Sequence, residues 1–214
     1  MVYPEVQDGS CRLVNHNEDR RIVRSKRALR DALISLMETK GFEAITVNDL
    51  CSAADLNRGT FYNHFSDKEH LLASFEEEVL GDISHIRNEM STLSVKEVMA
   101  YCLTKKPLPF LVSLFDYFRS QGDFLHAVLG PGGDPGFGSR LRDSFCTTLI
   151  QGVLHEKYRN DPDPFVSYYI SFYASAYLGV ITHWIEMGMK EDSQTMALIA
   201  MRLLFIKPGE PIRL

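Results

Sequence analysis

Hydrogen-bonding side chains are concentrated in the stretch NRGTFYNHFSDKEHLL, residues 57–72. A guanidinium, hydroxyls, an amide and an imidazole follow one another there, and such groups bind base edges and phosphate oxygens of nucleic acids. Gly59 has no side chain, so the backbone there can approach a ligand closely. This chemistry favours recognition of a polyanion. The candidate contacts are Arg58, Gly59, Thr60, Tyr62, Asn63 and His64.

The same stretch is a poor helix by intrinsic propensity. Glycine costs a helix about 1 kcal/mol relative to alanine, and aromatic residues recover little of it. Four rings nevertheless lie within residues 61–65 at helical spacing. Phe61 and Phe65 are four apart, so we expect both to face inward and hold a short helix, ending near Phe65, against its neighbours.

A block of positive charge precedes this stretch. Residues 20–30, RRIVRSKRALR, contain six basic residues and no acid, although the net charge of the chain is −5. An apolar stripe that includes Ile22 and Leu29 predicts a helix over residues 20–40, stopped by Gly41. The block is either a solvated helix surface or a localised face for a polyanion. The basic residues opposite the stripe, within an arc of about 60°, are Arg20, Arg24 and Arg27.

Short polar signals divide the residues between these two features into further helices. Thr46 is a plausible N-cap, with Asp49 three residues on in a capping-box arrangement. Asp55 tolerates the left-handed backbone of a tight turn, and Asn57 can cap the helix that follows. Ser66 is expected to cap a longer helix. Three helices, the last pair joined by a tight turn, predict a helix-turn-helix unit.

The segment AITVNDLCSAADLNRGTFYNHFSDKEHLL resembles the DNA-binding signature of the TetR-like bacterial transcriptional regulators, and the similarity runs through most of residues 20–75. By this resemblance, Thr46 starts the second helix and touches phosphate, Tyr62 is a phosphate contact, and Lys68 contacts the DNA backbone from the start of the fourth helix. The other candidates fall on recognition-helix positions. Asp55 departs from the family, which usually has glycine in the turn.

The resemblance implies an all-α fold. An N-terminal three-helix helix-turn-helix DNA-binding domain is joined by a long helix to a larger helical domain that dimerises and usually holds a ligand. We therefore expect a disordered arm over residues 1–18, the DNA-binding domain over residues 19–66, and the dimerisation and regulatory domain over residues 67–214.

The first half of the expected regulatory domain has helical patterns over residues 94–106, 107–121 and 122–130, and again over residues 140–158. The intervening PGGDPGFGS, residues 131–139, is rich in glycine like a phosphate-binding loop. It lacks the G-K-[ST] ending, and no strand pattern precedes it. A flexible connection is the favoured interpretation.

Residues 163–192 are apolar or small nearly all round, which is typical of a helix covered on most sides. Its partners are expected to be the core of the domain and a second subunit, together with the last helix, residues 193–206. This pattern resembles the paired helices of the family's dimer interface. The candidate interface residues are Phe165, Tyr169, Phe172, Ala176, Gly179, Met187, Met196, Ile199 and Leu203.

An effector cavity would need apolar walls and a few polar groups. For each aromatic residue here, a filled core or the interface is the favoured interpretation, and for His183 an interface position is favoured over a ligand contact or a pH sensor. The candidate lining residues are Phe110, Leu114, Phe118, Phe145, Tyr173, Tyr177, His183 and Trp184.

Composition bounds the cellular setting. The four cysteines Cys11, Cys51, Cys102 and Cys146 are far apart, which is typical of reduced thiols in a cytosol. The first residues lack a secretory pattern, and no apolar run is read as long enough to span a bilayer. We expect a cytoplasmic protein without a membrane partner.

Three function classes follow. The favoured one is a homodimeric transcriptional repressor released from a roughly palindromic operator by a small-molecule ligand; activation is an open alternative. The second keeps DNA binding but places control of the C-terminal domain in a protein partner. The third, an enzyme, has no support, because no nucleophile–base set, metal-ligand spacing or cofactor fingerprint is present. We expect no metal and no cofactor.

Overall fold

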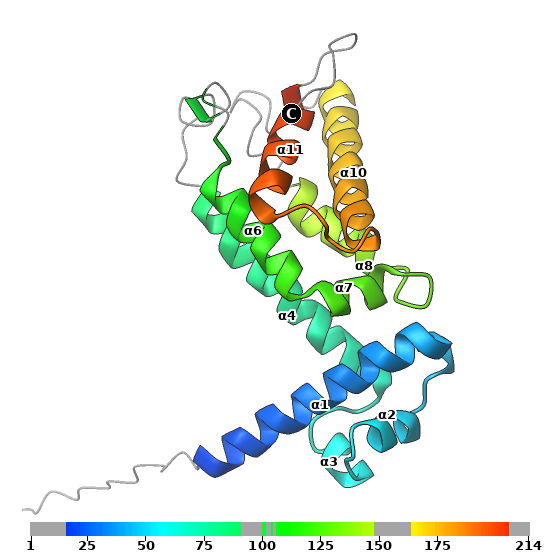
Figure 1. The fold of residues 1–214 in the computed structure, drawn as a ribbon. Coiled ribbons are helices and arrows are strands. Elements are labelled where there is room, and N and C mark those ends of the chain that lie inside the picture. The colour runs from blue at the N-terminus through cyan, green and yellow to red at the C-terminus, as the bar shows by residue number, and fades with distance from the viewer. Residues whose placement is uncertain (1–15, 91–99, 102–103, 105, 148–163, 206–214) are drawn as a thin grey trace, which may run out of the picture.

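The computed structural model describes residues 16–90, 100–101, 104, 106–147 and 164–205. These residues form helices and turns without a strand, which confirms the all-α prediction. Figure 1 shows two parts: a small unit of α1 to α3 and a larger bundle of α6 to α11, with α4 running from one to the other.

The first helix, α1 (His16–Lys40), begins earlier than predicted, so residues 16–18 of the expected arm are helical; residues 1–15 lie outside the described part. Leu29 and Leu33 are fully buried. Gly41 ends the helix as predicted: it adopts φ 76°, a left-handed conformation that favours glycine, and its amide donates to Met37.

The expected turn chemistry is confirmed in α2 (Val47–Ala53) and α3 (Arg58–Tyr62). Thr46 and Asp49 form a reciprocal capping box, and the Asn57 side chain accepts a hydrogen bond from the Thr60 amide. Asp55 occupies the turn with φ 52°. The short 3-10 helix η1 (Phe42–Ala44) precedes α2, and α3 ends at Tyr62, a turn earlier than predicted.

The cap of α4 (Lys68–Met90) differs from the prediction. Asp67, rather than Ser66, precedes the first helical residue, and its Oδ1 accepts from the His70 amide at 2.7 Å. The Ser66 hydroxyl donates to Asp67 at 2.9 Å. A carboxylate is the stronger acceptor at the positive end of a helix, so Asp67 takes the capping position.

The larger bundle packs α6 (Pro109–Ser120) against α4 and the C-terminal α11 (Ser193–Phe205). The bundle also contains α7 (Gly122–Leu129), α8 (Phe137–Leu141) and one π-helical turn, η2 (Arg142–Cys146). Most of the predicted helix over residues 94–106 and most of that over residues 140–158 fall outside the described residues.

Helix α10 (Pro164–Glu186) overturns one expectation. By length and composition alone it is apolar enough to cross a membrane, which the sequence pattern did not indicate because serines and tyrosines interrupt its apolar run. In this fold one face of α10 packs on α7 and η2, with Ala174, Ile181 and Ile185 buried.

The glycine-rich segment before α8 is not a loose connection. The Gly132 carbonyl accepts a hydrogen bond from the Phe42 amide at 2.7 Å, across the two parts of the molecule. A Cβ at position 132 would lie 2.8 Å from the Met37 carbonyl oxygen and 3.1 Å from the Gly41 Cα. Glycine is needed here because two backbones approach each other closely.

Candidate nucleic-acid interface and regulatory face

The recognition-helix candidate α3 is attached through two rings. Phe61 is fully buried and Phe65 nearly so, and their centroids lie 5.9 Å apart. Arg58, Tyr62 and Asn63 occupy the exposed arc, as the sequence predicts. A five-residue helix with a glycine is marginal by itself. The burial of the two phenylalanines therefore holds the exposed arc in place.

Arg58 and Tyr62 contact each other on this arc. The Nη2 of Arg58 donates to the Tyr62 hydroxyl oxygen at 3.1 Å, and the guanidinium carbon lies 5.6 Å from the centre of the ring. The hydrogen bond to Tyr62 raises the pKa of Arg58. The pair thus presents a cation together with a hydroxyl on the exposed surface.

The two candidate threonines use their hydroxyls within the domain. Thr60 donates to Asn57 Oδ1 at 3.1 Å. Thr46 donates to Asp49 Oδ2 at 2.6 Å, and Lys40 lies 2.6 Å from the same carboxylate. Hydrogen bonds from Lys40 and Thr46 lower the pKa of Asp49 to about 2. Both threonines therefore stabilise helix starts before any DNA is bound.

Lys68 is also engaged. Its Nζ donates to the carbonyl oxygens of Phe42 and Glu43, each at 3.0 Å, and lies 4.8 Å from the centre of the Phe42 ring. The side chain is only 15% exposed. In this arrangement Lys68 links the start of α4 to η1, 25 residues away, which the sequence pattern did not indicate.

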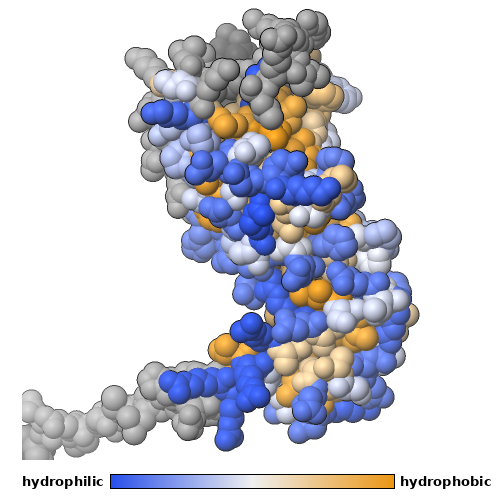
Figure 2. Space-filling model, viewed as in Figure 1, coloured by the Kyte–Doolittle hydropathy of each residue, from blue (hydrophilic) through white to orange (hydrophobic). Residues whose placement is uncertain are grey.

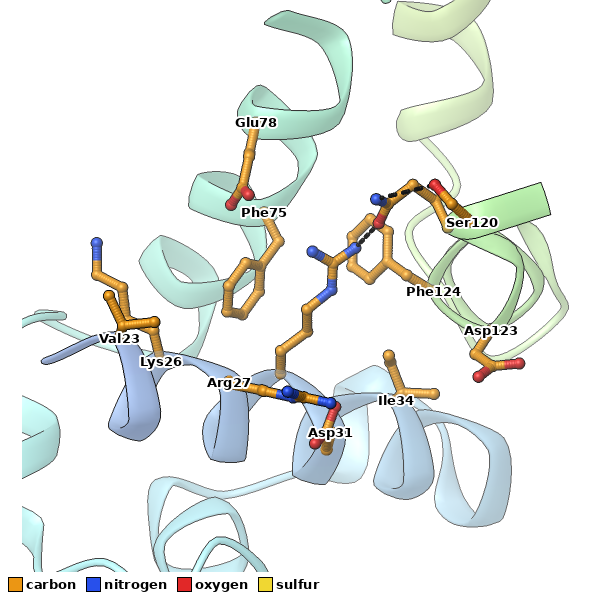
Figure 3. A pocket seen from close by; sticks show the side chains of 12 residues that line it. Val23, Lys26, Arg27, Asp31, Ile34, Phe75, Glu78, Ser120, Asp123 and Phe124 are labelled. Carbon is orange, nitrogen blue, oxygen red and sulfur yellow. Dashed lines mark hydrogen bonds between the residues drawn. The ribbon is translucent and has the colours of Figure 1, made fainter. Parts of the chain in front are cut away.

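The predicted basic face of α1 is exposed. Arg20, Arg24 and Arg27 all lie on the solvent side of the helix, and Figure 2 shows hydrophilic side chains where this helix projects beyond the rest of the small unit. Arg27 also lines a cleft between α1 and the larger bundle (Figure 3).

Arg30 lines this cleft of about 640 Å³, and the sequence did not predict a role for it. Phe75 of α4 and Phe124 of α7 line it above α1 (Figure 3). The Arg30 guanidinium carbon lies 5.4 Å and 4.8 Å from the centres of these two rings, and Arg30 donates to Gln121. Arg30 therefore joins the small unit to the bundle, and no local pattern marks a partner 91 residues away.

A second connection begins at the glycine-rich segment. Arg140 of α8 pairs with Glu76 of α4 and, at 2.8 Å, with Asp134. Glu76 is 4% exposed. Burial raises the pKa of its carboxyl to about 7, against the opposing effect of Arg140. These charges hold the segment that meets Phe42, so both connections run between α1–η1 and the α4–α8 region.

The predicted lining residues do not come together around one described cavity. Phe110, Leu114 and Phe118 are buried on α6, and the Phe115 ring meets the Trp184 ring at 5.3 Å. The Tyr177 hydroxyl donates to the Ala200 carbonyl, and Trp184 donates to that of Glu191 at 3.1 Å. Tyr173 is half-buried and His183 is exposed, whereas the Phe145 side chain lies outside the described part.

The predicted interface residues share a surface. Phe165 and Phe172 are 71% and 68% exposed, and Tyr169 lies half-buried between them. A groove of about 540 Å³ between α10 and α11 continues this surface, and Figure 2 shows an apolar area over these helices. Met196 differs, being 3% exposed at the floor of the groove. The remaining candidates on the groove are Ala176, Gly179, Met187, Ile199 and Leu203.

Comparison with known proteins places this geometry in a family. A model for bacterial regulatory proteins of the tetR family matches residues 25–75, and a TetR model for a transcriptional regulator C-terminal region matches residues 105–205. The first spans most of α1 through the start of α4, and the second spans α6 through α11. The chain belongs to the TetR family. Membership of this family makes it a transcriptional regulator, and transcriptional regulators are generally not enzymes.

One curated protein is similar over part of its length. An uncharacterized HTH-type transcriptional regulator of Bacillus subtilis, YxbF, is 30% identical over 93 residues, which are 40% of this chain and 24% of YxbF. The chain thus spans about a quarter of the length of that relative.

Among the residues described, no group of three His, Cys, Asp or Glu side chains could hold a metal ion.

Solved structures share the TetR fold. The fatty acid degradation regulator FadR from Bacillus halodurans is 18% identical with a TM-score of 0.60, covering 87% of this chain and 97% of that one. FadR from Bacillus subtilis, solved with stearoyl-CoA, is 15% identical with a TM-score of 0.56, covering 83% and 96%. At this identity the likeness concerns the fold alone.

Proposed function

We propose that this chain is a homodimeric repressor that binds a roughly palindromic operator through α3 and leaves it when a small molecule binds the larger domain. Its action is expected in the cytoplasm, without a catalytic step. TetR membership supports regulation of transcription, and the finer statements rest on the surfaces of this chain.

The observation that carries the proposal is the exposed arc of α3. Arg58, Tyr62 and Asn63 project from a helix anchored by two buried rings, and cations at positions 20 and 24 lie exposed on α1. A recognition helix in the major groove reads base edges with such side chains, while flanking arginines bind phosphates.

Dimerisation is supported by the apolar face of α10. Soluble chains rarely leave large rings such as Phe165 and Phe172 in water, so a second copy is the natural cover. A two-fold axis through this face would set the two α3 helices at successive major grooves, about 34–36 Å apart. The operator would then carry two inverted half-sites.

Release by a small molecule requires that the effector bind one state of the dimer better than the other. The solved FadR from Bacillus subtilis holds stearoyl-CoA, so acyl-CoA thioesters are reasonable first probes for this chain. The two connections between the domains, through Arg30 and through Gly132, give such a ligand a physical route to the α1–η1 corner.

A protein partner in place of a small ligand is the second candidate. The predicted lining residues Leu114 and Phe118 fill the core, whereas the groove between α10 and α11 is open to a partner. Control by a partner would leave acyl-CoA thioesters without effect on DNA binding.

Selection of bound duplexes from a random DNA pool tests the proposal. We expect purified protein to enrich one inverted repeat at near-physiological salt, and an added effector to lower its affinity. Retention at low salt alone, without any motif, would contradict sequence-specific binding by the free protein. A motif that resists every acyl-CoA probe would favour the protein-partner candidate.

A further inference from the structure

The Arg58 side chain is held at the beginning of α3. It contacts Tyr62, one helical turn later, by a hydrogen bond of 3.1 Å and through the face of the ring. A free arginine loses considerable rotamer entropy when a ligand fixes it, and a prior contact lowers that loss. The guanidinium is therefore partly ordered before DNA arrives.

The contact leaves most of the donors free. A guanidinium has five N–H groups, and Tyr62 accepts from one of them. Guanine presents two acceptors, N7 and O6, in the major groove, and a bidentate arginine is their commonest partner. Residues at the N-terminal end of a recognition helix are those that contact base edges. Arg58 is the first residue of α3.

Asn57 and Thr60 do not compete for this role. Asn57 Oδ1 accepts from both the amide and the hydroxyl of Thr60, so these two side chains serve the cap. Arg58 is the one arginine or lysine among residues 57–65. Asn63 is exposed and can make a separate contact one turn further along the helix.

We propose that Arg58 reads a guanine in each half-site of the operator, and that Tyr62 is a positioning residue that orients its guanidinium. This rests on the proposed function, in which α3 enters the major groove. The family resemblance implies a phosphate contact for Tyr62. A phosphate contact affects all sequences alike, whereas a positioning contact acts on one base pair, so the two roles are separable.

Selected motifs provide the first test. Wild-type protein should enrich an inverted repeat with a guanine in each half-site. Arg58→Met, selected at low salt, should lose a preference of about tenfold or more at that position. Arg142→Met is the matched control, because Arg142 also contacts a neighbour, Asp143 at 2.9 Å, but lies in the larger domain. A retained guanine in the Arg58→Met motif overturns the inference. Wild-type protein without a motif overturns the proposed function as well.

A modified base provides the second test and separates the two roles of Tyr62. Replacing the guanine by 7-deazaguanine removes N7 without disturbing base pairing. Wild-type affinity should fall about tenfold on this operator, and the fall should shrink to threefold or less in Tyr62→Phe. Tyr117→Phe, which loses a hydroxyl contact to Asp82, should behave as wild type. An equal fall in wild type and Tyr62→Phe would assign Tyr62 to phosphate and overturn its positioning role.

Discussion

At the scale of single residues, several side chains with an expected role on DNA already have partners inside the protein. Thr46 and Thr60 satisfy helix caps, and Lys68 donates to two carbonyl oxygens. Arg24 is exposed and Arg58 is oriented by Tyr62. We therefore expect fewer groups to contact DNA than the sequence suggests, and the difference is measurable.

Replacing Lys68 by methionine should destabilise the protein without changing the salt dependence of DNA binding. The substitution removes two hydrogen bonds from a charged donor that is 15% exposed, which costs about 2 kcal/mol in free energy of unfolding. Urea denaturation measures that loss.

Arg24→Met is the comparison. We expect it to reduce the slope of log K against log salt by about 0.9 for each phosphate contact removed, with little effect on stability. A reduced slope in Lys68→Met would show that Lys68 leaves its carbonyl partners to bind phosphate.

Glu76 should make stability depend on pH. Burial raises the pKa of its carboxyl from 4.5 to about 7, so the folded state favours the protonated form. The stability from this group is fully present below about pH 4.5 and is lost as the pH rises through about 7. Compared with Glu76→Gln, the wild-type free energy of unfolding should fall by up to about 3 kcal/mol between pH 4.5 and 8. A difference that stays constant with pH would mean that this carboxyl ionises normally.

At the scale of elements, the corner between α1 and η1 is held from two sides. Lys68 of α4 binds its carbonyl groups, and the Gly132 carbonyl binds its Phe42 amide. The segment with Gly132 is in turn fixed by Arg140 and by Asp134. A movement of α8 or α4 would therefore reach the DNA-binding unit through backbone contacts.

Gly132→Ala should loosen this corner. The added Cβ would lie 2.8 Å from a backbone oxygen of Met37, so one backbone must shift, at a cost of about 1–3 kcal/mol. Hydrogen exchange at Phe42 should become faster as its hydrogen bond weakens. Gly81→Ala is the matched control, because nothing lies within 4 Å of its Cβ position, and it should be neutral or stabilising. Unchanged exchange at Phe42 in Gly132→Ala would show that the segment yields without losing the contact.

At the scale of the whole molecule, the apolar face of α10 continues into the groove with α11. Phe165 and Phe172 lie toward one end and Gly179 near the groove. A second copy seated on this face would bury it and place both α3 helices on one DNA duplex.

Gly179→Glu should separate the dimer without harming the fold. A Cβ at Gly179 meets nothing within 4 Å, and replacing a helical glycine adds about 0.5–1 kcal/mol of helix stability. A charge from each subunit would instead be buried near the axis, weakening the dimer at least about tenfold. Sedimentation velocity measures this, with Gly81→Glu expected to remain dimeric. A dimeric Gly179→Glu would place the interface on another face.

The sequence by itself determined the features that depend on neighbouring residues. Helix periods, the Thr46–Asp49 capping box, the Asn57 cap and the left-handed Asp55 and Gly41 all follow from interactions within a few positions. The family signature also lies within one continuous segment. Both Ser66 and Asp67 have side chains that suit an N-cap, and the prediction that Ser66 caps α4 was wrong because Asp67 takes that position.

Only the tertiary structure decided which side chains are free. Arg30 meets a partner 91 residues away, Lys68 meets backbone 25 residues earlier, and Gly132 meets Phe42. Aromatic residues of α6 and α10 also look alike in sequence, yet Phe118 fills the core while Phe172 is exposed. The physical reason is that burial and hydrogen bonding are shared between distant segments, and no local pattern specifies which segments will meet.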